Sequence, residues 1–292
     1  ARDRLRRKRK LVRRDLPPAH FADAAVHELH RFRGPVRIAL RIRDEHAGVL
    51  SHAYHRAGAV GKPALLAYLG SELRIESAAS EPEVVDLANF LTKMGANIQG
   101  AGTRRIVIEG VEKLRGCNHT VIPDRIEAGT FMVAAAMMGD GVTLRRVCEE
   151  HMTVVTDLLR KCGHHVEFNE RGDTVTIIAG KTPKCGEIKT APYPGYPTDM
   201  QAQMTALFAT TPGISVVKDT IFPQRFMHCS ELKRMGADIK VDNGTAVISG
   251  VETLSGAPVM ASDLRASAAL VLAALKAEGT TEIHRLYHID RG

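Results

Sequence analysis

Residues 226–250 read FMHCSELKRMGADIKVDNGTAVISG, and three signals within this stretch decide the fold. Apolar side chains spaced three and four positions apart predict an amphipathic helix over residues 226–235. Gly236 follows, at the place where a helix C-terminus needs a left-handed residue. Asn243 and Gly244 then lie between alternating runs, which is a strong signal for a two-residue hairpin turn. The stretch therefore predicts a helix, a stop and a β-hairpin.

The same order of signals occurs twice more along the chain. Residues 84–94 and 154–162 show helical apolar spacing, and a glycine, Gly95 or Gly163, follows each run. Looser hairpin patterns come next and end near residues 110 and 180. These segments are therefore predicted to be copies of one supersecondary unit.

A second kind of helix is predicted after each hairpin, and each of these helices opens at an aspartate. The aspartates and their helices are Asp124 with residues 125–138, Asp199 with residues 200–209, and Asp263 with residues 264–277. These segments are apolar over most of their circumference, so we expect them to be buried. Each leads to a short strand, expected over residues 142–147, 214–217 and 281–284.

The repeats predict the architecture. Successive aspartates lie 75 and 64 residues apart, so one unit comprises about 70 residues of helix, hairpin, buried helix and strand. Residues 65–69 and 72–76 are similar to the tail of an earlier unit. Three copies around a central set of apolar helices predict an α/β fold with sheets outside and helices inside, the reverse of an ordinary α/β barrel.

The composition is that of an ordinary globular protein. The 292 residues are 44% hydrophobic and 25% charged, which allows one large or two medium domains. No apolar run approaches the ~20 residues of a membrane-spanning helix, and the charged first ten residues show no secretory signal. The five cysteines are odd in number and form no CxxC pair, which fits a reducing cytoplasm rather than a disulfide framework.

The positive charge is confined to one end of the sequence. Residues 1–60 hold 13 Arg and 2 Lys against 6 acidic residues, so this segment carries +9 whereas the whole chain carries +7. The segment does not follow the repeat pattern, and we interpret it either as a basic arm or as coding sequence read out of frame. Its arginines suggest nucleic acid as a partner. The absence of Trp, the 4% aromatic content and the lack of a binding motif argue against that partner.

Five motifs point to one family. They are IPDRIEAGT at 122–130, YPTDMQAQ at 196–203, RFMH at 225–228, DLRASA at 263–268 and HIDRG at 288–292. In this order they resemble the bacterial UDP-N-acetylglucosamine enolpyruvyl transferases, over about residues 72–292. That family folds as an inside-out α/β barrel in two lobes of three units each, in agreement with the repeats. The resemblance implies a truncated first lobe at residues 61–122 and a second lobe at residues 123–292, beside the unassigned basic segment 1–60.

The resemblance implies an activity as well as a fold. The family transfers the enolpyruvyl group of phosphoenolpyruvate to the 3′-hydroxyl of UDP-N-acetylglucosamine and releases phosphate. This is the first committed step of peptidoglycan synthesis, in the cytoplasm, and it serves cell-wall biogenesis, cell shape and cell division. The two expected partners are therefore the two substrates, with no metal ion, no cofactor and no membrane partner.

The resemblance further implies roles for individual residues. Asp199 matches the position that binds the sugar hydroxyl and acts as its general base, while Arg265 and Arg291 match the arginines that hold phosphoenolpyruvate. Ile221 matches a backbone contact to the nucleotide, and Arg125 matches a substrate-binding position. Proton transfer by a positioned side chain contributes ~10²–10⁴-fold to a rate. Arginine suits planar carboxylate and phosphate oxygens better than lysine does.

Each of these residues also has a structural interpretation. The alternatives are a helix cap for Asp199, an exposed helical cation for Arg265, a frayed charge for Arg291, a core residue at a strand end for Ile221, and ion-pair partners for Arg125 and Arg225. Arg265 would lie in the first turn of an apolar helix, where the helix dipole disfavours a cation. That conflict favours a functional role for Arg265.

Two features of the family are not found in this sequence. The family has a lysine–asparagine pair near its start and a proton-donating cysteine on a mobile glycine-rich loop. Residues 1–20 contain neither cysteine nor glycine, and none of the five cysteines lies in a matching motif. Cys162 and Cys229, although next to histidines, are expected to be buried thiols rather than metal ligands. We therefore expect little or no turnover from this chain alone.

Two other functions share this scaffold. One is that of a non-catalytic homologue that binds UDP-N-acetylglucosamine. The other is that of a shikimate-pathway enolpyruvyl transferase, against which the motifs at residues 198–203 and 288–292 argue.

Overall fold

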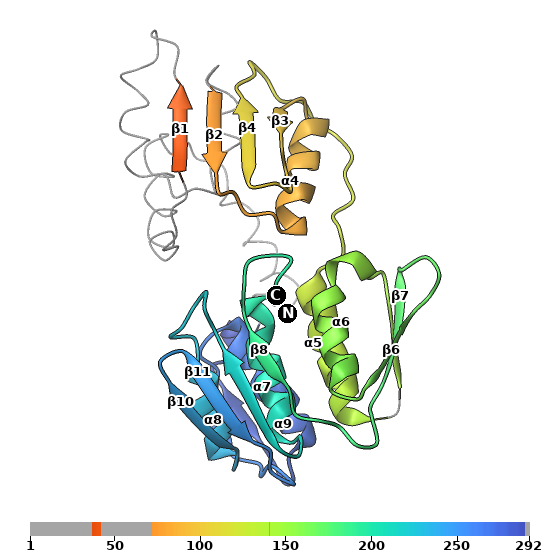
Figure 1. Ribbon diagram of the computed structural model, residues 1–292, viewed down its shortest axis with the longest axis vertical. Helices are drawn as coiled ribbons and strands as arrows, with labels where there is room; N and C mark the ends of the chain where they lie inside the picture. Colours follow the sequence, from red (N-terminus) through yellow and green to blue (C-terminus); the bar gives the residue numbers. More distant parts are fainter. Residues whose placement is uncertain (1–36, 42–71, 140, 290–292) are drawn as a thin grey trace, which may run out of the picture. The chain divides into compact units, whose positions relative to one another are not determined.

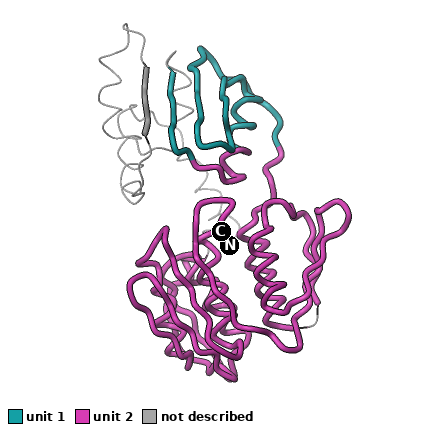
Figure 2. The backbone as a smooth tube through the Cα atoms, viewed as in Figure 1, with its two compact units in different colours: residues 1–78, 87–119 teal, residues 79–86, 120–292 magenta. Residues whose placement is uncertain are grey.

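The computed structural model describes the strand Arg37–Arg41 and residues 72–139 and 141–289. The chain divides into two compact units, which Figure 2 shows in two colours: residues 1–78 with 87–119, and residues 79–86 with 120–292. Strand β1 (Arg37–Arg41) lies in the basic segment, where the sequence pattern predicted no strand. The rest of that segment and residues 61–71 lie outside the described residues.

Unit 1 contains one sheet with the strand order β1-β2-β4-β3 and most of helix α4, which lies beside it (Figure 1). Its elements after β1 are β2 (Glu72–Glu76), α4 (Pro82–Lys93), β3 (Asn97–Gln99) and β4 (Arg105–Glu109). Alternate residues of β2 and β4 are buried, as a half-buried strand requires. The helix and hairpin predicted from residue 84 onward are thereby confirmed.

Unit 2 contains the other two predicted repeats and all three of the predicted buried helices. Its first repeat comprises α5 (Arg125–Met138), β5 (Val142–Arg145), η3 (Glu149–His151), α6 (Thr153–Lys161), β6 (His165–Phe168) and β7 (Thr174–Ile178). The second comprises β8 (Glu187–Lys189), η4 (Thr198–Met200), α7 (Gln201–Ala209), β9 (Ile214–Lys218), α8 (Met227–Arg234), β10 (Asp238–Asp242) and β11 (Thr245–Ser249). After them come β12 (Pro258–Met260), α9 (Leu264–Lys276), β13 (Glu282–His284) and η5 (Leu286–His288).

Three of the sheets repeat one topology, and the fourth described sheet is the parallel pair β12-β13. In each of the three, a strand is followed by an amphipathic helix and a hairpin, and the first strand pairs with the second hairpin strand: β2-β4-β3, β5-β7-β6 and β9-β11-β10. All these pairings are antiparallel. At the turn of the third hairpin, Asn243 and Gly244 have φ of 44° and 74°, and Asp242 pairs with Thr245. This is the two-residue turn that the sequence predicted.

The apolar helices form the centre of unit 2. All nine residues of α7 are buried, and α7 contacts both α5 and α9. Figure 1 shows α9 beside α7. The inner faces of the sheets complete the same core, with Val175, Val217 and Ile248 at 0% exposure. Helices inside and sheets outside confirm the inside-out α/β fold. No helix in the described part of the chain is long and apolar enough to cross a membrane.

Two of the three aspartates cap their helices as predicted. The Asp124 carboxylate accepts the backbone N–H groups of Ile126 and Glu127, at the start of α5. Asp263 accepts those of Arg265 and Ala266, at the start of α9. These bonds satisfy backbone donors that a helix N-terminus otherwise leaves unpaired.

The cap of α5 can be tested by substitution. Replacing Asp124 by Ala should lower the free energy of unfolding by ~1 kcal/mol, because two backbone donors lose their acceptor. Chemical denaturation of the full chain measures this difference. Asp124→Ser, which retains a capping oxygen, should recover most of the loss, and an unaltered midpoint in the Ala variant would contradict the assignment.

Candidate active site

Asp199 does not cap a helix. It lies inside the 3₁₀ turn η4, ahead of α7, and its carboxylate makes no bond to the helix backbone. Its Oδ1 accepts from Nη1 of Arg225 at 2.5 Å, and its Oδ2 accepts from Nη2 of Arg265 at 3.2 Å. The helix-cap interpretation is therefore wrong for Asp199, although it is correct for Asp124 and Asp263. We call Asp199, Arg225 and Arg265 the Asp199 cluster.

Arg225 is held in place along its backbone and its side chain. Its N–H donates to the carbonyl of Phe222, and its own carbonyl accepts from the buried amide of Gln201 at 2.6 Å. The guanidinium lies over the Phe222 ring, 5.9 Å from its centroid. Nη2 is also 3.9 Å from Oδ1 of Asp263. Arg225 therefore bridges the carboxylates of Asp199 and Asp263.

Arg265 reaches Asp199 from the first turn of α9. The dipole of that helix opposes a cation at this position, as the sequence indicated. The opposition is offset because Asp263 caps the same turn and Asp199 accepts from the guanidinium. The side chains of Arg265, Arg225 and Asp199 are 21%, 25% and 36% exposed, so a ligand in solution can reach all three.

The arginines control the charge of Asp199. Burial by itself would raise the pKa of this carboxyl, but the hydrogen bond from Arg225 and the positive charges of Arg265 and Arg225 outweigh it and lower the pKa. Asp199 is therefore ionised at neutral pH. It can accept a hydrogen bond from a hydroxyl group, and two arginines at the same place can hold an anion.

His228 is the buried neighbour of this cluster. It is 1% exposed, its ring stacks on Phe226, and burial lowers its pKa to about 4 despite the attraction of Asp263. The nearby positive charge of Arg225 acts in the same direction as burial. His228 is therefore neutral at neutral pH and adds no further positive charge beside Arg225.

The lowered pKa of His228 predicts a pH dependence of stability. Above pH 6.5 the histidine is neutral in both the folded and the unfolded chain, so its burial does not lower the free energy of unfolding. As the pH falls from 6.5 toward 4, the unfolded chain takes up a proton that the folded chain excludes, and about 3 kcal/mol of stability is lost. Urea unfolding of the full chain at pH 7.5, 6, 5 and 4.5 should show this loss, and His228→Gln should flatten the curve. His165→Gln, at an exposed histidine, is the matched control, and a curve flattened as much by it as by His228→Gln would contradict the role given to His228.

The other predicted residues differ in how the structure places them. Ile221 lies three residues beyond β9 and is half-buried, and its N–H donates to Asp219 at 2.9 Å. A backbone contact to a nucleotide would therefore have to use its carbonyl. Arg125 donates to Glu83 at 2.8 and 3.4 Å and lies over the Tyr193 ring at 5.4 Å, which matches its ion-pair alternative. Arg291 lies outside the described residues.

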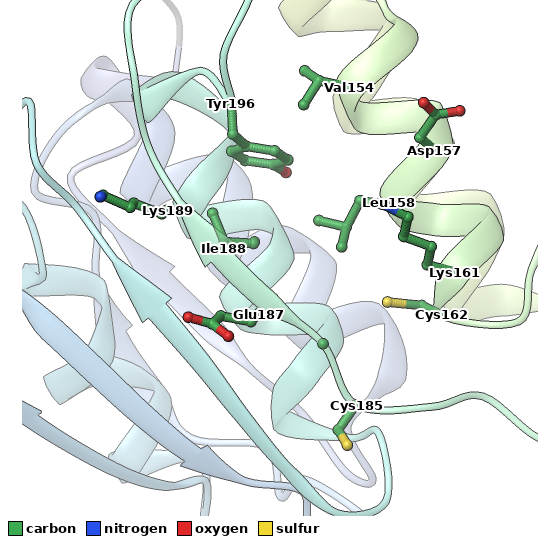
Figure 3. Close-up of a pocket in the computed structure, with 11 residues that line it drawn as sticks. Val154, Asp157, Leu158, Lys161, Cys162, Cys185, Glu187, Ile188, Lys189 and Tyr196 are labelled. Carbon is green, nitrogen blue, oxygen red and sulfur yellow. The ribbon is translucent and has the colours of Figure 1, made fainter.

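A separate cavity lies between α6 and β8 (Figure 3) and has a volume of about 500 Å³. The residues that line it include Leu158 on the helix, Ile188 on the strand, and Tyr196. No residue of the Asp199 cluster lines it. Cys162 also lines it, and burial raises the pKa of this thiol to about 11. Burial likewise raises the pKa of Cys229 to about 12. Both cysteines are buried thiols, as predicted, and neither is set up as a nucleophile.

The described residues contain no group of three or more His, Cys, Asp or Glu side chains that could hold a metal ion. What the Asp199 cluster offers is instead a carboxylate acceptor between two guanidinium donors. Sequence reasoning identified Asp199 and Arg265 and gave Arg225 the weaker role of an ion-pair partner. It gave no role of its own to Gln201, which was noted only as part of the motif at residues 196–203, or to Asp219, whose one local signal is an acidic side chain two residues beyond the predicted strand 214–217.

Comparison with known proteins places this arrangement in context. Residues 33–292 match the sequence profile of the family EPSP synthase (3-phosphoshikimate 1-carboxyvinyltransferase). The chain is 59% identical over 218 residues to UDP-N-acetylglucosamine 1-carboxyvinyltransferase 1 of Caldanaerobacter subterraneus subsp. tengcongensis, a match that covers 75% of this chain and 52% of the relative. It is 56% identical to UDP-N-acetylglucosamine 1-carboxyvinyltransferase of Methylacidiphilum infernorum, covering 75% of this chain and 51% of that relative. The chain thus spans about half the length of the curated relatives it matches.

Solved structures show the same fold. The enolpyruvyl transferase NikO from Streptomyces tendae superposes with a TM-score of 0.69 at 27% identity, over 77% of this chain and 54% of that protein. An EPSP synthase from Acinetobacter baumannii gives a TM-score of 0.54 at 24% identity, over 70% of this chain and 51% of that protein. The second likeness extends to the fold alone.

Proposed function

This chain belongs to the EPSP synthase family of carboxyvinyl transferases, and we propose from that premise that the Asp199 cluster is part of a UDP-N-acetylglucosamine enolpyruvyl transferase site. The reaction moves the enolpyruvyl group of phosphoenolpyruvate to the 3′-hydroxyl of the sugar nucleotide and releases phosphate. Relatives named for that acceptor are 56–59% identical to this chain, whereas the EPSP synthase structure is 24% identical. This difference favours the sugar nucleotide over a shikimate as acceptor.

The setting follows from the reaction. Phosphoenolpyruvate and nucleotide sugars are cytoplasmic metabolites, so the proposed location is the cytoplasm. The proposed role is the first committed step of peptidoglycan synthesis, on which cell-wall biogenesis, cell shape and cell division depend. Arg291, Ile221 and Arg125 are proposed as further substrate contacts.

The observation that carries the proposal is the pairing of Asp199. Both of its oxygens accept hydrogen bonds from arginines on other elements, whereas the equivalent aspartates, Asp124 and Asp263, cap α5 and α9. A carboxylate in this position can accept the proton of a sugar hydroxyl. The two guanidinium groups match the carboxylate and the phosphate of phosphoenolpyruvate.

The ion pairs also suggest how the two substrates are coupled. With the arginines bound to it, Asp199 is a weak base because they lower its pKa. When the anionic groups of phosphoenolpyruvate take those guanidinium donors, Asp199 loses its partners while its burial remains, and its pKa rises. The base is then strengthened when C2 of phosphoenolpyruvate comes next to the sugar hydroxyl. The 3′-oxygen bonds to C2 and its proton passes to Asp199, while the methylene carbon C3 takes a proton from a donor outside the Asp199 cluster. C3 then gives up a proton to re-form the double bond, the C2–O bond to phosphate breaks, and the phosphate leaves with the proton that Asp199 accepted.

Binding to the chain itself is the first test. Calorimetric titration of the full chain with UDP-N-acetylglucosamine should show an interaction that Asp199→Ala weakens. Shikimate 3-phosphate, titrated in parallel, should give no heat. If the full chain binds neither compound, or binds only the shikimate, the sugar-nucleotide assignment is wrong.

Turnover needs the remainder of a carboxyvinyltransferase, and a hybrid enzyme supplies it. The 218 matching residues of this chain would replace those of the Caldanaerobacter relative. The hybrid should release phosphate from phosphoenolpyruvate when UDP-N-acetylglucosamine is present. A hybrid that binds the sugar nucleotide but releases no phosphate would favour the non-catalytic alternative.

A further inference from the structure

Asp219 is the most heavily hydrogen-bonded buried carboxylate near the site, and neither the sequence motifs nor the proposed mechanism uses it. It directly follows β9 and is 2% exposed. Its Oδ2 accepts from Oγ1 of Thr198 at 2.6 Å. Its Oδ1 accepts from Oγ1 of Thr190 at 2.8 Å and from the N–H groups of Ile221 and Phe222 at 2.9 and 2.8 Å. Four donors from three segments therefore meet at one side chain.

These bonds reach both partners of the Asp199–Arg225 ion pair. On one side, Thr198 immediately precedes Asp199 within the turn η4. On the other, Phe222 accepts the N–H of Arg225 with its carbonyl and supports the Arg225 guanidinium with its ring. Asp219 does not need to touch the ion pair, because it fixes the residues that carry it.

Thr190 extends the same network to the end of β8. Its Oγ1 donates to Asp219 and accepts from the N–H of Thr220, and its carbonyl accepts from the Thr220 hydroxyl at 2.6 Å. Thr190 is 0% and Asp219 2% exposed, so an unpaired polar group on either side chain would be costly. The loop after β9 is consequently held to the end of β8 and to η4 at once.

The repeat itself shows that this loop is unusual. In the other repeats, the residue directly after the equivalent strand has a left-handed backbone: Ser77 after β2, Arg146 after β5 and Arg285 after β13, with φ of 55°, 60° and 61°. Asp219 occupies this position after β9 and is not among the residues with positive φ. Where the other repeats have a left-handed residue, the repeat that contains η4 therefore has a loop that is hydrogen-bonded to the carboxylate of Asp219.

We infer that Asp219 is a positioning residue for the proposed transfer reaction: through Thr198 and Phe222 it holds Asp199 and Arg225 in register with each other. The inference rests on the proposed function, since it concerns the group that would accept the proton. It goes beyond that function because it assigns a role to a residue that takes no part in the proposed proton transfer.

The sharpest test removes one bond of the network in the full chain. Thr198→Val deletes the hydroxyl that binds Asp219 and keeps the shape of the side chain, and Thr198→Ser restores the hydroxyl. Titration of the Asp199 carboxyl by ¹³C NMR should show a higher pKa in Thr198→Val than in the unsubstituted chain, because Asp199 spends less time between Arg225 and Arg265. Thr198→Ser should return the pKa of Asp199 to its value in the unsubstituted chain. Affinity for UDP-N-acetylglucosamine should fall about tenfold in Thr198→Val.

A matched control separates positioning from stability. Thr143→Val also removes a hydroxyl contact, the one with Thr176 across β5 and β7, at 3.1 Å. It should leave the titration of Asp199 unchanged. If Thr198→Val and Thr143→Val lower the unfolding temperature alike and neither moves the pKa of Asp199, the network is structural only and the inference is overturned.

A second variant keeps the test decisive if Thr198→Val folds poorly. Asp219→Asn is nearly isosteric and keeps one oxygen for three of the four donors. It should raise the pKa of Asp199, and it should speed hydrogen exchange at the N–H groups of Ile221 and Phe222 because a neutral amide oxygen is a weaker acceptor than a carboxylate. The titration of Asp199 needs no substrate, so it decides the positioning role even if UDP-N-acetylglucosamine fails to bind. Absence of binding to the unsubstituted chain would count against the proposed function alone.

Discussion

Replacing Asp199 by Asn in the hybrid enzyme should lower kcat by ~10²–10⁴-fold, the contribution of a positioned proton acceptor. The amide has nearly the shape of the carboxylate and can still accept from one arginine, but it cannot take the hydroxyl proton. It also leaves Arg225 and Arg265 facing a neutral group in place of the carboxylate that both now bind. Initial rates of phosphate release at saturating substrates measure the effect.

The control for this substitution is another aspartate beside an arginine. Asp173 is paired with Asn169 at 2.7 Å and lies 4.0 Å from Arg171, on the hairpin of β6 and β7. Asp173→Asn in the same hybrid should change kcat less than twofold. If Asp199→Asn retains more than a tenth of the original rate, Asp199 is not the base, and the cluster would have to act by holding anions only.

Replacing Phe208 by Ala should lower the free energy of unfolding of the full chain by ~3–5 kcal/mol, as expected for loss of a fully buried aromatic ring. Phe208 is 0% exposed near the end of α7, within the single core of unit 2. A Cβ added at Gly186 would lie 3.0 Å from the edge of the Phe208 ring, so the ring already lies close to the backbone before β8. Truncation would leave a cavity that this close-packed region cannot readily fill.

Phe131 provides the matched comparison. It lies on the central helix α5 but is 54% exposed, so Phe131→Ala should cost less than about 1 kcal/mol. Urea denaturation of both variants gives the two values. Equal losses would show that the difference in burial between the two rings does not govern stability here, contrary to the inside-out arrangement.

The sequence predicted the repeats because their signals are local. Helical spacing, a glycine after the last turn and the Asn243–Gly244 turn each depend on neighbouring residues, and Gly95, Gly163 and Gly236 all have positive φ in the structure. The strands β8 and β12 were missed. Each has only three residues and pairs in parallel with a strand beyond the following helix, so little in its own sequence reveals it.

The role of Asp199 could not be decided by the same local reasoning. Asp124, Asp199 and Asp263 all precede an apolar helix, and a cap was expected for each. Asp199 is engaged instead by arginines 26 and 66 residues away, which outcompete the local backbone donors. Only the family motif pointed to its function. Asp219 escaped notice because its partners, from Thr190 to Phe222, come together only through the packing of three segments.

Helix α7 links folding and chemistry in one element. Its first residue, Gln201, binds the carbonyl of Arg225, and all nine of its residues are buried. Natural sequence variation should therefore be low across residues 201–209, because a substitution there affects both the folding of the core and the geometry of the site. The outer helices α6 and α8 each have a solvent-exposed face. Sequence variation should be greater on those faces, and surface residues there could be engineered without disturbing the core or the site.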